Sequence, residues 1–304
     1  MAEFIQHLIN GIGQGAIYAL IALGYTMVFG ILQLINFAHS EVYMMGAFAG
    51  FYLSRYLGLS DHPGIGSLLI GMCGAMAFSG ILGFTIERLA YRPLRKSPRI
   101  NVLITAVGVS LFLQFGGQLV FGPDPKFFPP LFAADEPIRF ALGGSEVQIN
   151  VLQLIVLTVS LALMVTLRTI IFHTRPGRAM RAVSHSHANA ALMGINVDRT
   201  ISFVFVLGSA LAGAAGVLVA LTYPKIDPLM GVMFGLKAFV AAVVGGIGNV
   251  TGAVMGALIL GIAESLVVGY WASTYRDALA FAILIGILLF RPAGILGQFR
   301  PEKV

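Results

Sequence analysis

Ionisable side chains interrupt several long apolar stretches of this 304-residue sequence, chiefly His39, Glu41, Lys237 and Glu264. Charged groups inside a membrane are costly, so such residues usually face a bundle interior or a water-filled path. They could form a proton relay, contact a solute in transit, or join helices as an internal pair. For Glu264, set among isoleucines and leucines, the sequence favours an internal pair with a lysine or a histidine.

Two interruptions of the apolar pattern bring further polar or flexible residues into these regions. One runs from Gly30 to Glu41, and the other is the glycine-rich run 245–249. Irregular backbone inside a membrane is tolerated only where protein or a water-filled cavity surrounds it. The candidate pathway residues are therefore Asn36, His39, Glu41, Gly245, Gly246, Gly248, Asn249 and Glu264.

Glycine also recurs every four residues at positions 248, 252 and 256. On a helix this spacing forms one smooth stripe that lets a neighbouring helix approach closely. The pattern favours ordinary packing within the chain over a role in a pathway.

The connection 172–199 carries the signals of a short helix followed by a turn. In chain order they are a breaker at Pro176-Gly177, a cap at Ser184 or Ser186, helix formers at 188–193 and a left-handed position at Gly194. Small alanines surround an apolar knob formed by Leu192 and Met193. Such a helix could insert into a groove of another protein, or lie on anionic lipid through its arginines.

Motifs that would indicate an enzyme are missing from the sequence. No lysine has the flanking residues of a Walker phosphate loop, and neither a His-Glu-x-x-His zinc motif nor a Gly-x-Ser-x-Gly nucleophile elbow occurs. The single cysteine, Cys73, allows no internal disulfide and no thiolate cluster. The sequence predicts a protein without catalytic residues, bound metal or other cofactor of its own.

The elements that must position these residues are membrane helices. Hydrophobic residues make up 58% of the chain and charged residues 11%, whereas globular domains carry roughly 25% charged residues. Apolar runs typical of membrane helices lie near 8–29, 41–57, 67–87, 100–121, 149–171, 200–222, 235–247, 250–270 and 277–290. We expect an all-α polytopic integral membrane protein, one domain over 1–304, with eight or nine transmembrane segments. Some segments are broken or re-entrant, and one break in each half would fit an inverted repeat.

The basic residues indicate the orientation of these segments. Of the 19 lysines and arginines, thirteen lie in 88–99, 168–199 and 291–304. Basic connections stay in the cytoplasm, so we expect the amino terminus outside and the carboxyl terminus inside. Topology thus accounts for the net charge of +6 without nucleic acid as a partner. The proline-rich connection 122–148 is then external, either a docking or lid surface or a plain spacer.

Taken together, the motifs resemble the branched-chain amino acid permease family of ABC importers. They span nearly the whole chain in order: Asn36-Phe37-Ala38-His39-Ser40-Glu41, Glu87-Arg88-x-Ala90-Tyr91-Arg92-Pro93, Gly177-Arg178-Ala179-x-Arg181-Ala182, Leu192-Met193-Gly194-Ile195-Asn196-Val197-Asp198-Arg199, Gly245-Gly246-Ile247-Gly248-Asn249-x-x-Gly252 and Arg291-Pro292-x-Gly294-Ile295-Leu296-Gly297. The chain departs from the family pattern at Ser40, usually glycine, at Asn249, usually serine, and at His185-Ser186-His187, usually acidic or proline-containing.

The resemblance implies a translocation subunit in a bacterial inner membrane. Its partners would be a second homologous permease, two cytoplasmic ATPases and an external binding protein that delivers a branched-chain or other hydrophobic amino acid. The ATPases would couple to the connection 172–199 through Arg178, Arg181, Ala190, Ala191, Leu192, Met193 and Gly194. Glu41 or Glu264 could meet the ammonium group of the substrate. An apolar sleeve for its side chain could come from Phe37, Met44, Met233 and Phe234.

A proton-coupled secondary transporter of small polar or amino-acid solutes is the alternative, with His39, Glu41 and Glu264 as a proton relay. The residues of the connection 172–199 that resemble an ATPase-docking helix argue against this alternative, because a secondary carrier has no ATPase to dock. The substrate stays open among branched-chain amino acids, other amino acids, amides and urea.

Overall fold

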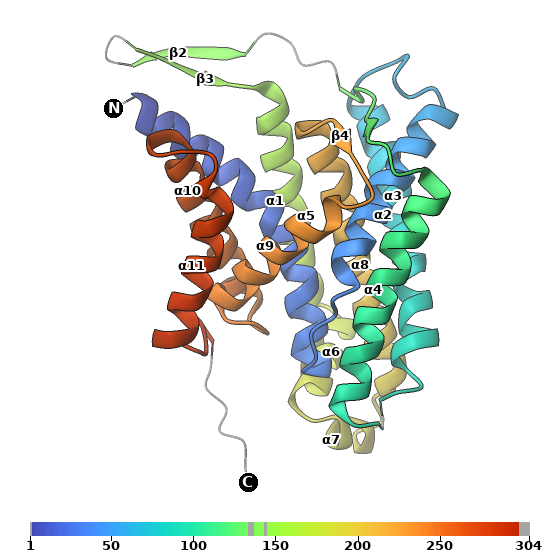
Figure 1. The fold of residues 1–304 in the computed structure, drawn as a ribbon. Coiled ribbons are helices and arrows are strands. Elements are labelled where there is room, and N and C mark those ends of the chain that lie inside the picture. The colour runs from blue at the N-terminus through green and yellow to red at the C-terminus, as the bar shows by residue number, and fades with distance from the viewer. Residues whose placement is uncertain (1, 96, 133–136, 143–144, 298–304) are drawn as a thin grey trace.

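The computed structural model describes residues 2–95, 97–132, 137–142 and 145–297, and helices dominate it (Figure 1). In chain order they are α1 (Ala2–Leu32), α2 (His39–Tyr56), α3 (Ile65–Ile86), the π-helical turn η1 (Glu87–Tyr91), α4 (Arg99–Phe121), α5 (Val151–His173), α6 (Arg175–His185), α7 (His187–Leu192), α8 (Val197–Thr222), α9 (Met230–Gly245), α10 (Val250–Tyr270) and α11 (Tyr275–Phe290). The predicted apolar segments coincide with α1 to α5 and α8 to α11, so the all-α membrane fold is confirmed.

Among the described residues, six helices are long and apolar enough to cross a membrane: α1, α3 with η1, α4, α5, α8 and α10. The helices α9 and α11 have 16 residues each. At about 1.5 Å per residue they fall short of a hydrocarbon core of roughly 30 Å. The helix α2 has 18 residues and starts with polar side chains. Both α2 and α9 adjoin one of the predicted breaks, at 33–38 and 246–249, and both breaks are irregular.

The structure corrects two predicted boundaries. The helix α1 begins at Ala2 rather than near residue 8, and Gln6 in its first turns exchanges two hydrogen bonds of 2.8 Å with the backbone of Gln148. Pro176 does not break a helix but lies in the first turn of α6, which Thr174 caps. A proline is tolerated there because its missing N–H would have no helical partner. The connection therefore holds two helices, α6 and α7, where one was predicted.

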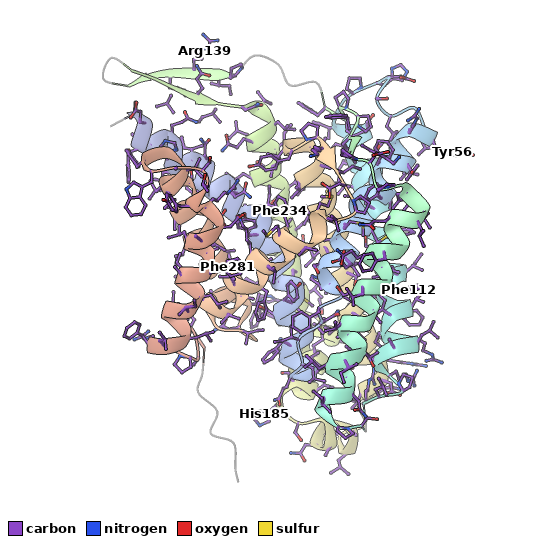
Figure 2. The ribbon with its side chains drawn as sticks, viewed as in Figure 1. Tyr56, Phe112, Arg139, His185, Phe234 and Phe281 are labelled. Atoms are coloured by element: carbon purple, nitrogen blue, oxygen red, sulfur yellow. The ribbon has the colours of Figure 1, made fainter. Side chains whose placement is uncertain are left out.

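The centre of the bundle is formed by α1 and α8, and 83% of the apolar window of each is buried. Only 22% is buried in α4 and in α5, which lie outside. Small residues let the inner helices meet closely: a Cβ at Gly46 would lie 2.5 Å from the Cα of Gly213. Figure 2 shows Phe112 of α4 pointing away from the bundle and Phe234 of α9 pointing into it. The outer surface is apolar and suits lipid or another membrane subunit.

Short strands lie at the end of the bundle where α1 begins (Figure 1). The strand β1 (Lys126–Phe127) pairs antiparallel with β4 (Lys225–Ile226), and β2 (Ile138–Leu142) forms a hairpin with β3 (Ser145–Ile149). The described part of the proline-rich connection therefore contains short strands and no long helix; residues 133–136 and 143–144 lie outside the described part. The connection from η1 to α4 and the pair α6 and α7 lie at the opposite end (Figure 1).

Candidate functional site

Glu264 and Lys237 are buried in an ion cluster that joins four helices, and the cluster extends to the partly exposed Arg276 and Asp277. Oε1 of Glu264 lies 3.1 Å from Nζ of Lys237 in α9. Its Oε2 accepts hydrogen bonds of 2.9 Å from Oη of Tyr18 in α1 and from Nε of Arg276 in α11. Nζ of Lys237 also lies 2.6 Å from Oδ1 of Asp277. Two acids and two bases thus balance within the bundle, and the predicted pair of Glu264 with a lysine is confirmed.

Three members of this cluster, Tyr18, Arg276 and Asp277, are not among the candidate residues that the sequence pattern indicated. Arg276 and Asp277 lie at the boundary of the last apolar segment. In the sequence, Tyr18 is one of many large side chains within the apolar segment of α1, so it gives no signal of a polar contact. The neighbouring Arg276 and Asp277 at a segment boundary were the signal that could have found them. A buried acid such as Glu264 requires a partner of opposite charge.

The break 33–38 is held in place by hydrogen bonds. Oδ1 of the buried Asn36 accepts a hydrogen bond of 2.7 Å from Oη of Tyr91. Oγ of Ser40 donates to the carbonyl of Phe37 at 2.9 Å and so closes the first turn of α2. Asn36 and Ala38 are buried, whereas Gln33 at the start of the break is exposed, so protein surrounds only the later part of the irregular backbone.

Glu41 faces a cavity of about 180 Å³ between α2, α4 and α9. Its Oε2 is buried and has no hydrogen-bond partner in the described part of the chain. Gly231 makes room for the carboxylate, because a Cβ there would lie 2.9 Å from this oxygen. The other lining side chains include polar Ser40, Ser110 and Gln114 and apolar Phe37, Leu236 and Phe239. An unpaired carboxylate beside apolar rings suits a small solute with a cationic group and an apolar body.

His39 does not line this cavity. Its ring is buried against α1, where Gly24 leaves the space that a side chain would fill, and its centroid lies 4.8 Å from that of the Tyr25 ring. Across the described residues, no hydrogen bond joins His39, Glu41 and Glu264 to one another. Direct hydrogen bonds between described side chains therefore do not connect the three residues of the alternative hypothesis.

A second polar cluster links η1 and the residues after it to the start of α8. Glu87 is fully buried; it accepts hydrogen bonds from Arg95 and, at 2.6 Å, from Oγ of Ser202. Asp198 binds Arg92 at 2.5 Å and Arg95 at 2.6 Å. The Glu-Arg-x-Ala-Tyr-Arg-Pro motif of the sequence therefore holds η1 against α8.

Two tethers connect the surroundings of α7 to the break between α1 and α2. The first runs from Asp198, which follows α7, through the arginines to η1, where Tyr91 binds Asn36. The second starts on α7 itself: Nε2 of His187 lies 2.9 Å from the carbonyl oxygen of Ile31, in the last turn of α1. The departure from the family pattern at His187 thus supplies a direct contact between α7 and α1.

The short helix α7 ends in exposed apolar side chains. Oγ of Ser186 caps it and Gly194 terminates it at a φ of +80°, so the predicted cap and turn are confirmed. Ala190 is 3% exposed and anchors α7 to the bundle, whereas Leu192 and Met193 are 85% and 83% exposed. Large apolar side chains so fully exposed together are typical of a surface that contacts lipid or another protein.

Arg181 lies apart from this tip. It donates to the carbonyl of Ile171, and its guanidinium lies 5.4 Å from the centroid of the Phe172 ring. The structure thus uses Arg181 to join α6 to α5, while Arg178 is exposed on α6.

The glycine run 245–249 packs against the carboxyl-terminal segment of the same chain. Gly246 has a φ of +103°, and a Cβ on it would overlap the backbone of Gly297. Asn249 caps α10 and also donates from Nδ2 to the carbonyl of Leu296 at 2.9 Å. Asparagine and serine are both good N-caps, which explains how asparagine can stand at a position that is usually serine. The predicted irregular turn is confirmed, and the neighbours of Gly246 are backbone atoms of this chain.

The glycine stripe is shorter than the sequence suggested. Gly248 has a φ of +94° and lies in the turn, before α10 begins. Gly252 and Gly256 do lie on α10, against the backbone of α9 at Gly245 and Ala241. Their role is close packing within the chain, which the sequence favoured.

Gly246→Ala is expected to reduce the yield of folded protein. A non-glycine residue at a positive φ costs about 1–3 kcal/mol, and the new Cβ would also overlap Gly297. Uptake per folded molecule should stay normal, because these neighbours belong to packed backbone. The measurement is monodisperse protein by size-exclusion chromatography together with uptake normalised to it. The matched control is Gly286→Ala in α11, where no atom lies within 4 Å of the new Cβ. Normal yield with lost turnover in Gly246→Ala would instead indicate a pathway role.

Comparison with known proteins gives consistent matches over almost the full length. Residues 7–288 match the family described as "Branched-chain amino acid transport system / permease component". The chain is 44% identical to the high-affinity branched-chain amino acid transport system permease protein LivH of Escherichia coli (strain K12), covering 99% of this chain and 98% of that protein. It is 42% identical to the corresponding protein BraD of Pseudomonas aeruginosa over the same shares of both chains. The E. coli permease LivM is 24% identical, over 94% of this chain and 69% of LivM.

Proposed function

Because the chain belongs to the branched-chain amino acid transport permease family, we propose that it is the membrane-spanning subunit of an ABC importer for branched-chain or other hydrophobic amino acids. Two cytoplasmic ATPase subunits hydrolyse ATP, and an external binding protein delivers the substrate. A second permease, similar to LivM, completes the membrane part of the complex. The complex lies in a bacterial inner membrane.

The exposed apolar tip of α7 is the observation that carries this proposal. Leu192 and Met193 protrude from the bundle on a helix that is capped and anchored at Ala190. An apolar pair on a rigid helix fits a groove of a partner protein. Interfacial lipid is the competing explanation: Arg181 is bound to the end of α5, whereas Arg178 stays exposed and could reach anionic headgroups.

The two tethers supply a route from the ATPases to the membrane interior. A displacement of α7 acts on α1 through the contact of His187 with Ile31, and on α2 through Asp198, η1 and Asn36. Both routes end at the break, one turn from Glu41 and its cavity. Nucleotide-driven movement of α7 would thus open or close the cavity where the ammonium group of the substrate meets Glu41.

Uptake by the reconstituted complex is expected to require ATP. The permease is combined in proteoliposomes with its ATPases, second permease and binding protein, and uptake of radiolabelled leucine is followed. Transport should stop without ATP and continue in the presence of a protonophore. Uptake that persists without ATP and collapses with the protonophore would establish the secondary transporter instead.

Cysteine labelling should place the α7 end of the bundle in the cytoplasm and the hairpin end outside. Cys73 is exposed, so it is first replaced by alanine. In that background, Ser97→Cys and His185→Cys should react only with reagents that enter the cell. Lys126→Cys and Arg139→Cys should react with reagents that stay outside. The basic connections motivate this orientation, and the reverse labelling pattern would overturn it.

A further inference from the structure

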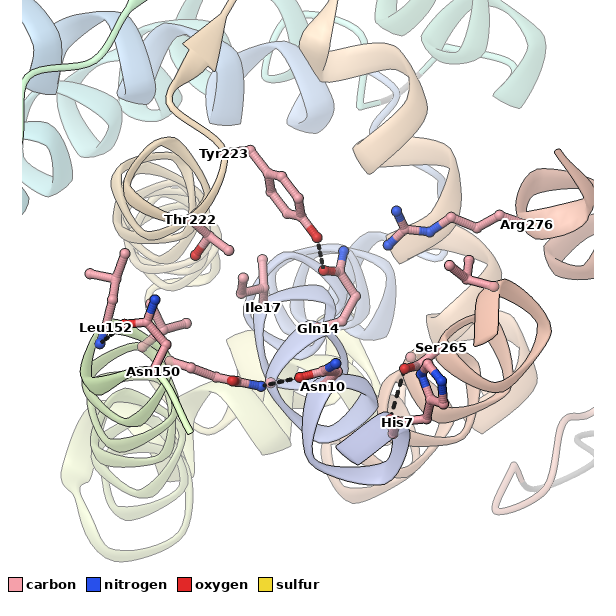
Figure 3. A pocket seen from close by; sticks show the side chains of 15 residues that line it. His7, Asn10, Gln14, Ile17, Asn150, Leu152, Thr222, Tyr223, Ser265 and Arg276 are labelled. Atoms are coloured by element: carbon pink, nitrogen blue, oxygen red, sulfur yellow. Dashed lines mark hydrogen bonds between the residues drawn. The ribbon is translucent and has the colours of Figure 1, made fainter. Parts of the chain in front are cut away.

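A pocket of about 370 Å³ lies around the first half of α1, between α5, α8 and α10 (Figure 3). It lies at the hairpin end of the bundle, far from the tip of α7. Its volume is in the range of small-molecule sites, roughly 300–1,000 Å³. Polar side chains of Gln14, Gln153, Tyr223 and Arg276 line it together with apolar Ile17 and Val268.

Gln14 offers an unused hydrogen-bond donor in this pocket. The residue is 8% exposed, and its Oε1 accepts a hydrogen bond of 3.0 Å from Oη of Tyr223. Its Nε2 is buried and has no partner in the described part of the chain. A buried donor without an acceptor is unfavourable. The site therefore favours a ligand that brings an acceptor.

Arg276 adds a charged donor on the same side of α1. Its Nε is bound to Glu264, whereas its terminal guanidinium nitrogens make no hydrogen bond or ion pair with other described residues. Figure 3 shows the guanidinium reaching toward Tyr223 and Gln14. Guanidinium groups bind carboxylates through paired hydrogen bonds, and an amide N–H adds a third.

The charged residues beside the pocket favour one net charge of a carboxylate ligand over others. Arg276 and Lys237 are already balanced by Glu264 and Asp277. A ligand with a net negative charge would disturb this balance, whereas a zwitterion would not. Apolar Ile17 and Val268 provide a surface for a hydrophobic side chain.

We infer that this pocket holds the α-carboxylate of a hydrophobic amino acid at the outer mouth of the permease, through Gln14 and Arg276, before the substrate reaches the cavity at Glu41. This inference rests on the proposed function, because it gives the transported amino acid a first contact in the membrane subunit. Tyr223 is a positioning residue: its hydroxyl occupies Oε1 of Gln14 and so leaves Nε2 for the ligand.

The test measures binding of radiolabelled L-leucine to the purified complex, without binding protein, in nanodiscs of phosphatidylcholine alone. This lipid keeps anionic headgroups away from the pocket. Two competitors separate the ends of the substrate: 4-methylpentanoate has the carboxylate without the ammonium, and 3-methylbutylamine has the ammonium without the carboxylate. We expect the acid to displace leucine from the pocket more strongly than the amine does.

Variants then connect the competition to this pocket. Gln14→Leu should weaken leucine binding about tenfold or more, the effect of losing one hydrogen bond to a charged group. It should also remove the advantage of the acid over the amine. Tyr223→Phe should lower affinity less, by freeing Oε1 of Gln14. Gln148→Leu makes the same replacement on the exposed hairpin at the same end and should bind like the wild type.

The outcomes separate this inference from the proposed function. Wild-type complex that transports with ATP but shows no saturable leucine binding at millimolar concentration overturns the inference alone. So does unchanged affinity in a monodisperse Gln14→Leu complex, or stronger competition by the amine. Absence of ATP-driven uptake by the wild type contradicts the proposed function itself.

Discussion

Leu192→Asp is expected to detach the ATPase subunits from the permease and to abolish ATP-driven uptake. Leu192 is 85% exposed at the tip of α7, and in the proposed complex it lies in an apolar groove of the ATPase. An unpaired carboxylate buried there costs about 3–5 kcal/mol, which weakens association by roughly 10²-fold to 10³-fold or more. The amount of ATPase that copurifies with tagged permease measures this loss.

Two controls show that the effect belongs to the tip of α7. Leu192→Met keeps an apolar side chain of similar volume and should retain the ATPases. Tyr56→Asp adds the same charge at a position that is 88% exposed at the far end of the bundle, and it too should retain them. If Leu192→Asp still copurifies with normal amounts of ATPase, the docking role of α7 is rejected.

Glu264→Ala is expected to destabilise the permease more than any other single change in its membrane interior. The substitution leaves Lys237 and Arg276 without the buried carboxylate that both contact; Lys237 keeps Asp277, whereas Arg276 loses its one ion-pair partner among the described residues. Loss of one partner from a buried ion pair costs about 3–5 kcal/mol. Thermal unfolding in detergent, followed by size-exclusion chromatography, should show the loss as a lower midpoint and a smaller folded fraction.

The variant Glu264→Gln separates this structural role from proton transfer. Glutamine keeps an oxygen that can accept hydrogen bonds from Tyr18 and Arg276, so the loss of stability should be smaller than with alanine. Uptake per folded complex should stay near the wild-type value. Normal stability of Glu264→Gln combined with abolished uptake would favour a proton relay and contradict the assignment of a structural cluster.

Local features of this protein could be read from the sequence because their causes are local. Runs of about 20 apolar residues are needed to cross the hydrocarbon core, and their positions predicted the long helices. The shorter apolar run before the glycine turn likewise predicted α9. Caps and left-handed positions depend on one or two residues, so Ser186 and Gly194 bounded α7 as expected. The sequence pattern predicted that Pro176 breaks a helix, but it lies in the first turn of α6. A proline is unfavourable inside a helix and acceptable in its first turn. Which of these two cases applies depends on where the preceding helix ends, and the sequence alone did not show this.

Partners across helices were decided by the tertiary structure alone. Sequence reasoning identified Glu264 as a residue in need of a partner, but the faces on which Tyr18, Arg276 and Asp277 meet it depend on how four helices pack. Close helix packing also placed Gly246 against the carboxyl-terminal segment and the ring of His39 against Gly24. Neither residue lines the cavity at Glu41. The sequence thus determined the helices, the breaks and the family, whereas the packing of small residues in the core decided which buried polar groups are paired and which have no partner in the described part of the chain.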